Sequence, residues 1–155
     1  MKKFPPMGFD IAKREAVIYD QGTEQFTGTT LEGIGQAVVG VLTHLDETRN
    51  RFVQVMSIKT CQNELLEAFE SVTGEKWEVR RDTSKRILES GRKKHRAGKG
   101  GWTLDLAVTQ LFDEGQARGL VARSREESDS DMLGIAAESA RDIAKKCLGL
   151  WPASL

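Results

Sequence analysis

The amino-acid sequence predicts a single mixed α/β (α+β) domain over residues 1–155, with a small sheet of about four strands and about five helices. Its length fits one domain. Hydrophobic residues make up 39% of the chain and charged residues 30%, which leaves enough apolar mass for a core. Short β-prone runs also alternate with longer segments of helical periodicity, the pattern typical of proteins that combine both element types.

The first third of the chain predicts two strands and one helix. Residues 15–19 and 25–29 are short β-prone runs, and the turn between them contains Gly22, so we expect two strands joined by that turn. Thr29, with Glu32 three residues later, predicts a capping box. The apolar residues that follow recur at helical spacing: Leu31, Ile34, Val38, Val41, Leu42 and Leu45. This spacing predicts a strongly amphipathic helix.

The middle of the chain predicts a strand, a helix and a second strand. Residues 52–58 are mostly apolar and predict a strand. Thr60 is a suitable cap for a helix with Leu65, Leu66, Phe69 and Val72 on one face, and Gly74 is its stop signal. Residues 76–80 alternate in polarity, as a strand with one exposed face does. We therefore expect a βαβ unit with two parallel strands and a right-handed crossover.

The last part of the chain predicts three helices and a polar loop. One helix begins at Asp82 or Thr83, continues to about residue 97 and is interrupted by glycines at 98, 100 and 101. A second helix is indicated by Leu104, Ala107, Val108 and Leu111. Residues 123–131 are polar and predict a loop. A final helix is indicated by Ala136, Ala140, Ile143, Ala144, Cys147 and Leu148.

Charge and cysteine content narrow the function classes. The chain has 23 basic and 23 acidic side chains, so its net charge favours neither nucleic acid nor a membrane as a partner. No apolar run approaches the ~18 residues of a membrane span. Cys61 and Cys147 fit no metal or redox spacing, and two thiols do not make a disulfide framework. We expect a cytoplasmic protein without a metal site.

One segment departs from this even charge distribution. Residues 76–101 contain ten lysines and arginines but three acidic residues, and both flanking segments are net acidic. Such a segment is able to contact phosphates. A solvated helix face balanced by neighbouring acidic residues is the commoner reason for such a charge run.

Two glycine patterns resemble nucleotide-binding motifs. Gly33, Gly35 and Gly40 superficially match a dinucleotide fingerprint, but that motif needs its glycines in the turn between a strand and a helix. Here they fall inside the predicted amphipathic helix, where glycines more often allow close packing of the helix on a sheet. Residues 28–33 have the first spacing of a P-loop, but Ile34 and Gly35 stand where lysine and serine or threonine are required.

A few residues are candidates for chemistry. His44 lies near a predicted helix end, where we expect its imidazole to contact free carbonyls. His95 lies among lysines and arginines that favour its neutral form, as a base requires, although a surface position is the commoner outcome. The large aromatic residues either line a pocket or fill the core: Trp77, Trp102, Phe112 and Trp151. The core is favoured for each, least clearly for Trp102.

The run GFDIAKREAVIYDQGTEQFTGTTLEGIGQAVVGVLTHLDETRNRFVQV, followed by TCQNELLEAFESVTGEKWEV, resembles the C-terminal half of fungal NmrA-like proteins. These are atypical short-chain reductases related to the isoflavone and pinoresinol reductases. The resemblance extends from about Gly8 to Val79 and more loosely to Leu148. It implies that family members carry, in a first half absent from this sequence, a Rossmann domain with the NADPH loop and, in the reductase branch, the catalytic lysine.

The resemblance further implies that this half supplies one wall of a substrate pocket and adds strands to the Rossmann sheet. Gly33 stands where many relatives have Asp, so we transfer no catalytic residue. We expect no cofactor on this chain. Surfaces that would pack on a Rossmann half, and one strand edge, would be exposed. A homodimer is the simplest way to cover them.

Three functions follow from these expectations. The first is a stand-alone pocket protein of secondary metabolism that binds a small apolar natural product and acts as a cofactor-independent isomerase, cyclase or lyase. Its candidate catalytic residues are Tyr19, His95 and Asp105, and its candidate substrate-binding residues are Trp102 and Phe112.

The second function is a non-catalytic regulatory or partner-binding module of the NmrA-like type, with the basic helix from Lys85 to Lys99 as its docking surface. The third is an inactive truncated form of an NADPH-dependent reductase.

Overall fold

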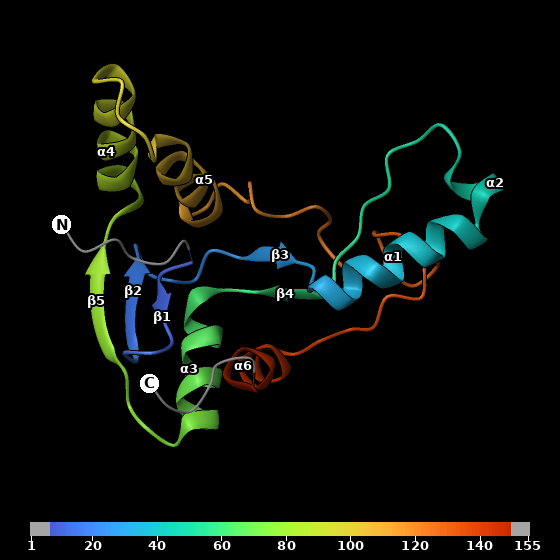
Figure 1. Cartoon of the computed structure of the whole chain (residues 1–155), viewed down its shortest axis with the longest axis horizontal. Coiled ribbons are helices and arrows are strands. Elements are labelled where there is room, and N and C mark those ends of the chain that lie inside the picture. The colour runs from blue at the N-terminus through green and yellow to red at the C-terminus, as the bar shows by residue number, and fades with distance from the viewer. Residues whose placement is uncertain (1–6, 150–155) are drawn as a thin grey trace.

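A computed structural model describes residues 7–149, and its elements confirm the mixed α/β class (Figure 1). Within this range a three-stranded sheet has the order β1-β2-β5, with β1 antiparallel and β5 parallel to β2. A separate antiparallel pair is formed by β3 and β4. The strands are β1 (Phe9–Asp10), β2 (Glu15–Tyr19), β3 (Phe26–Gly28), β4 (Ile58–Thr60) and β5 (Glu78–Asp82).

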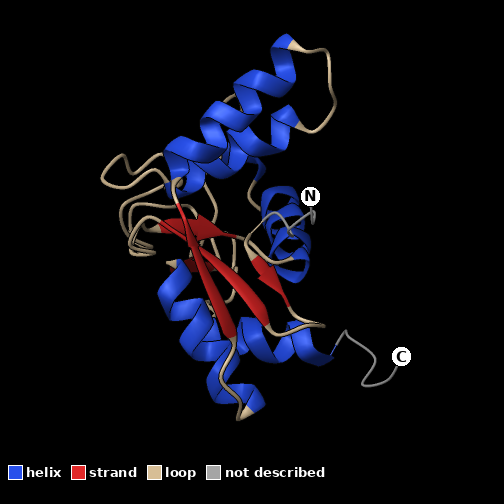
Figure 2. Ribbon diagram, turned by 90° about the vertical axis from the view of Figure 1, so that its left-hand side faces the viewer, coloured by secondary structure: helices blue, strands red, loops and turns tan. Residues whose placement is uncertain are grey.

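The helices of the described residues fall into three groups. They are α1 (Leu31–Thr43), α2 (Leu45–Thr48), α3 (Gln62–Thr73), α4 (Ser84–Arg96), α5 (Trp102–Phe112) and α6 (Ala140–Gly149). The helices α4 and α5 pack on each other, as do α3 and α6, and α1 with α2 forms an arm at the opposite end from α4 (Figure 1). Figure 2 shows the strands with helices above and below them. No helix among residues 7–149 is long and apolar enough to cross a bilayer.

The core lies between β2 and α3. Ala16 and Ile18 of β2 are fully buried. The side chain of Gln62 at the start of α3 accepts a hydrogen bond from the Tyr19 N–H (2.9 Å) and donates one to the carbonyl of Val17 (3.0 Å). This amide therefore ties α3 to the backbone of β2, where an unpaired polar group would be costly.

Aromatic side chains complete this end of the core. Phe69 lies between Phe9 and Trp77, with ring centroids 5.3 and 5.0 Å away. Trp77 is buried, as the sequence predicts for a core residue. Trp151, the other candidate of this kind near the C-terminus, lies outside the described residues.

The strand segments were predicted better than their pairing. The run 15–19 is the strand β2, and the run 25–29 contains the shorter strand β3. The two do not pair with each other, because they belong to different sheets. The predicted βαβ unit is also wrong in its partners. The strand β5 is parallel to β2, and the strand that precedes α3 pairs instead with β3.

The strand predicted over residues 52–58 is largely absent, since β4 begins only at Ile58. The backbone N–H of Gln54 donates to the carboxylate of Asp129 (2.9 Å), and that of Met56 donates to the hydroxyl of Ser130 (2.9 Å). Side chains of a distant loop therefore accept the hydrogen bonds of these two backbone N–H groups, which a neighbouring strand would otherwise accept.

The helix ends follow local signals, shifted by a residue or more. Thr30, not Thr29, caps α1 by accepting a hydrogen bond from the Gly33 N–H (3.2 Å). Cys61, not Thr60, occupies the cap position of α3. Gly74 ends α3 in the left-handed conformation that glycine favours, as predicted. The helix α6 begins at Ala140 rather than near residue 136, and the sequence did not predict the short α2.

The glycines of α1 allow a close approach, but to a loop rather than to a sheet. A Cβ placed on Gly40 would lie 2.8 Å from the Cα of Leu133, too close for any side chain. A Cβ on Gly33 would meet Thr29 at 3.0 Å and Ile135 at 3.5 Å. The glycine pattern therefore belongs to helix packing, and these residues do not form the strand-to-helix turn that binds a pyrophosphate.

Candidate functional site

Two of the five predicted site residues meet in the core. Tyr19 ends β2, and its ring stacks on Phe112 of α5 with a centroid distance of 5.4 Å. Phe112 also makes an edge contact with Phe26 at 5.6 Å and is 2% exposed. Core neighbours thus surround the Phe112 ring.

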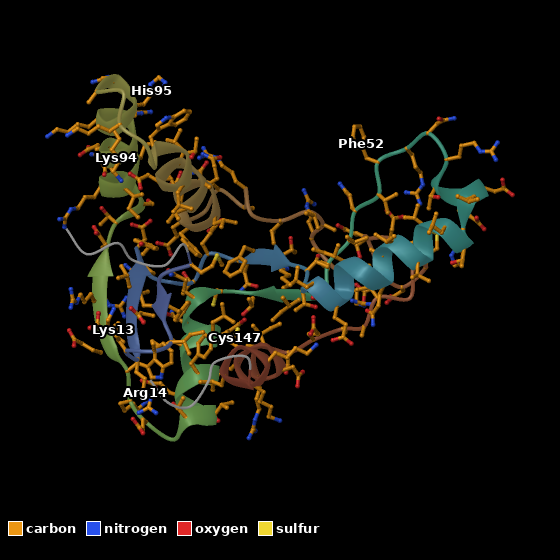
Figure 3. The ribbon with its side chains drawn as sticks, viewed as in Figure 1. Lys13, Arg14, Phe52, Lys94, His95 and Cys147 are labelled. Carbon is orange, nitrogen blue, oxygen red and sulfur yellow. The ribbon has the colours of Figure 1, made fainter. Side chains whose placement is uncertain are left out.

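Two others meet at the turn between α4 and α5. The rings of His95 and Trp102 lie edge to face, with centroids 4.6 Å apart. Trp102 is half-buried, and His95 is exposed at the far end of α4 (Figure 3). Gly98 and Gly101 have φ values of 61° and 86°, in the region that favours glycine, and they reverse the chain between the helices. The ring contact closes this turn.

The fifth residue, Asp105, faces α4. Its carboxylate lies 2.6 Å from Lys94 Nζ, and both side chains are partly buried, 17% and 28% exposed. A Cβ on Gly91 would lie 3.0 Å from the Cβ of Asp105, so Gly91 is what lets the two helices come this close. The ion pair with Lys94 joins α4 to α5.

Tyr19 is held in its neutral form. Burial raises the pKa of Tyr19 to about 12, and the negative charges of Asp82 and Asp105 act in the same direction. A phenol with this pKa donates a hydrogen bond at neutral pH and does not serve as a base. Tyr19 and Asp105 therefore share one electrostatic neighbourhood, while His95 lies at the far end of α4. Catalytic roles for the three remain a prediction.

Sequence reasoning missed a polar group at the carboxyl ends of β2 and β5. Asp20 follows β2, and its carboxylate accepts a hydrogen bond from the Ser84 N–H (3.2 Å) at the start of α4. The Ser84 hydroxyl in turn bonds to Asp113 at the end of α5 (3.3 Å). Parallel strands place such residues at one edge, where ligands of α/β proteins bind. Polar residues directly after each β-prone run were the available signal, and here they fasten α4 and α5 to the sheet.

Two grooves lie on the surface of residues 7–149, and neither of these two is lined by a predicted site residue. The larger, of about 690 Å³, lies between α1 and the 131–134 loop, with Val39, His44 and Leu133 in its wall. The Nδ1 of His44 lies 2.9 Å from the carbonyl of Gly40, which confirms the predicted role at a helix end. The smaller groove, of about 390 Å³, is lined in part by Val121 and Arg123.

Metal-binding groups are not assembled in the part of the chain that the structure describes. No three His, Cys, Asp or Glu side chains in residues 7–149 are placed to share an ion. Cys61 is a buried free thiol and Cys147 a half-buried one, and burial raises the pKa of Cys147. A raised pKa disfavours the reactive thiolate form of Cys147.

The most unusual surface of the molecule is α1. Its large apolar side chains point outward, and their exposed fractions are 88% for Leu31, 48% for Ile34, 56% for Val38, 62% for Val39 and 65% for Leu42. The helix α1 therefore presents an exposed apolar face. Contiguous surfaces of this kind mark interaction sites.

Comparison with known proteins relates the chain to oxidoreductases. It is 59% identical over 150 residues to a protein named oxidoreductase poxI from Penicillium oxalicum. A stretch of 73 residues is 30% identical to oxidoreductase aprR from Aspergillus flavus, covering 47% of this chain and 25% of that protein. No protein-family model matches the chain.

The match to poxI covers 97% of this chain and 48% of poxI. The chain thus spans about half the length of the curated relative that it matches almost end to end. Both relatives are named oxidoreductases, which agrees with the reductase-like part of the resemblance.

Proposed function

We propose that this chain is the substrate-side half of an NmrA-like oxidoreductase of fungal secondary metabolism, working with a second half that binds the nicotinamide nucleotide. One observation carries the proposal, the 59% identity to oxidoreductase poxI over nearly the whole chain. At that identity we expect the matched part of poxI to share the fold of this chain. Since the match spans 48% of poxI, the remaining half of the chemistry belongs to another region.

The glycines of α1 support this division. A nucleotide pyrophosphate binds a glycine-rich turn that leads from a strand into a helix. In this chain Gly33 and Gly40 are buried inside α1, against Ile135 and Leu133, and are committed to packing. The candidate motif therefore offers no bare backbone amides to a phosphate, and the proposal assigns that task to the second half.

The cofactor-independent isomerase, cyclase or lyase has less support. Such an enzyme needs an enclosed apolar cavity with an acid–base group in its wall. Tyr19 lies in the core, His95 on the surface and Asp105 in an ion pair with Lys94. A purely regulatory module with the basic helix as its docking surface would use exposed side chains of α4 such as Arg92 and Lys93. The relatives' names favour redox chemistry over both alternatives.

A chimeric protein tests the proposal. In it, this chain replaces the 150 matched residues of poxI, and turnover of poxI's own substrate with NADPH is compared among poxI, the chimera and the isolated chain. We expect the chimera to keep kcat/KM within about tenfold of poxI and the isolated chain to show no turnover.

Two results would contradict it. One is a folded chimera, with the circular dichroism of poxI, that turns over no substrate. The other is an isolated chain that converts the substrate without any nucleotide, which would restore the isomerase or lyase interpretation.

A further inference from the structure

The helix α1 has its faces reversed relative to an ordinary surface helix. Its small residues Gly33 and Gly40 are buried against the 133–135 segment, and Gln36 on the same face accepts a hydrogen bond from the Ala136 N–H (2.9 Å). Its large apolar residues lie on the outer face. An apolar stripe normally faces the core of its own chain. Here the rest of the described chain meets only the narrow glycine side.

The outer face has the pattern of a packed interface. Leu31, Ile34, Val38 and Val41 follow the three-and-four spacing with which helices interdigitate. In the whole of α1 the only charged residue is Glu32, and its carboxylate is paired with Lys146 of α6 at 2.6 Å. A partner for this face must therefore be apolar and uncharged.

The exposed surface continues beyond α1. Phe52 is 97% exposed on the loop that returns from α2, on the same arm of the molecule as α1 (Figure 3). A helix of 13 residues is ~20 Å long, and its face alone is smaller than the ~800 Å² that each partner buries in a standard interface. A partner that covers both α1 and the Phe52 loop would bury more surface than one that covers α1 alone.

We propose that the outer face of α1 is the docking surface for a polypeptide equivalent to the half of poxI that this chain does not match. The 150 matched residues omit too little of the chain to exclude α1, so poxI contains a corresponding helix together with a further region of similar size. That region is a partner large enough to cover the arm. The inference rests on the proposed function in one respect, because both invoke a second half.

A second copy of this chain is the alternative occupant, and it corresponds to the homodimer that the sequence predicts. Two copies joined through α1 alone would bury one short helix face each. The length difference from poxI instead points to a distinct region as the cover. A second copy would already protect α1 from labelling in the isolated chain, whereas the other half of poxI would protect it only in the chimera.

Thiol labelling separates these outcomes. Val38→Cys and Leu42→Cys are placed in the isolated chain and in the poxI chimera, and the rate of reaction with a water-soluble maleimide is measured. Val38 and Leu42 are 56% and 65% exposed, so both thiols should react fast in the isolated chain. In the chimera we expect both rates to fall at least about tenfold.

Leu104→Cys on α5 is the matched control, because Leu104 is an exposed apolar residue (44%) away from the arm. Its rate should be the same in both proteins, and the parent chain corrects for Cys61 and Cys147. Equal rates at Val38→Cys and Leu42→Cys in the two proteins would overturn the proposal. So would slow labelling in an isolated chain that light scattering shows to be a dimer. The readout needs no turnover, so a failed activity test and a failed docking test are distinguishable.

Discussion

The helices α1 and α4 pack on the rest of the molecule through opposite kinds of face. Each extends from the strands, and each uses a glycine for close approach, Gly40 against Leu133 and Gly91 against Asp105 (Figure 1). The helix α4 turns its apolar residues toward α5 and the core and displays basic side chains. The helix α1 turns Gly33 and Gly40 inward and displays apolar side chains.

The difference shows that an amphipathic pattern states which side of a helix needs cover but not what provides it. For α4 the cover is α5, next in the chain. For α1 the described residues provide cover only on the narrow face. A helix with three glycines in 13 residues also has weak intrinsic stability, at about 1 kcal/mol lost per glycine.

What holds α1 in place is its base. The buried carboxylate of Glu138 accepts hydrogen bonds from the Thr30 hydroxyl (2.8 Å) and from Lys146 Nζ (2.7 Å). Burial raises the pKa of Glu138, but the hydrogen bonds from Lys146, Ser57 and Thr30 outweigh it, so the pKa lies below its ordinary value. The arm is thus anchored firmly at its start and left open along its outer face.

The largest expected effect separates the two faces of α1. Gly40→Val places a side chain where even a Cβ meets the Leu133 backbone, and we expect it to lower the free energy of unfolding by about 3 kcal/mol. Gly35→Ala is the control on the same helix, because nothing lies within 4 Å of its Cβ position. That variant should gain up to about 1 kcal/mol from helix propensity. Chemical denaturation measures both free energies of unfolding. An unchanged value for Gly40→Val would contradict the close contact of Gly40 with Leu133.

The next effect concerns the sheet end of the α4–α5 pair. The pKa of Tyr19 is 10.0 ordinarily and about 12 in the folded protein, so folding favours the protonated phenol. The associated stability is complete below about pH 10 and is lost as pH rises to 12, by about 2–3 kcal/mol in all. Tyr19→Phe should lack this loss when unfolding is compared between pH 9 and 12.

Because Tyr19 is the only tyrosine in the chain, ultraviolet absorbance follows its ionisation directly. A transition near pH 10 in the folded protein would show that the ring is more accessible than the structure indicates.

A smaller effect tests the ion pair that joins α4 to α5. Lys94→Met leaves the partly buried Asp105 without its partner and should cost about 1 kcal/mol of unfolding free energy. The pKa of Tyr19 should rise further, because the Asp105 charge is then uncompensated. Lys93→Met removes a neighbouring exposed charge and should change neither quantity. Equal effects of the two variants would mean that only the overall charge of α4 matters.

The smallest expected effect sharpens the comparison most. Val38→Ser in the isolated chain should alter the unfolding free energy by less than about 0.5 kcal/mol, because the side chain is already in water. Its counterpart in the core, Val17→Ser, should cost several times more, since Val17 is 5% exposed. A large loss at Val38 in the isolated chain would mean that part of this chain, or a second copy of it, already covers α1.

Local signals in the sequence predicted most of the helices. The helices over 62–73, 84–96 and 102–112, the glycine that ends α3 and the contact of His44 with the end of α1 all depend on neighbours within a few residues. The pairing of strands was not predictable in this way. The segment 52–58 has an apolar, strand-like sequence, yet Asp129 and Ser130, more than 70 residues away, bind its backbone.

The candidate site divides in the same manner. Composition and spacing identified Tyr19, Asp105, His95, Trp102 and Phe112 as side chains able to do chemistry or bind a ring, but their grouping is a tertiary property. The structure joins Tyr19 to Phe112 and His95 to Trp102, and it pairs Asp105 with Lys94. The polar residues after β2 and β5 lie at one edge of the sheet because the two strands are parallel neighbours, and the sequence did not predict that pairing.

By itself, the sequence determined where most of the helical segments lie and that α1 has a wide apolar face, because these properties arise from interactions among residues close in the chain. Only the tertiary structure decided which way that face points. The choice depends on Gly40 meeting Leu133 across some 90 residues of chain, a steric fit that no local pattern encodes. Only glycine fits against Leu133 at this position, so α1 packs through its glycine side. Leu31, Val38 and Leu42 are therefore left exposed for a partner.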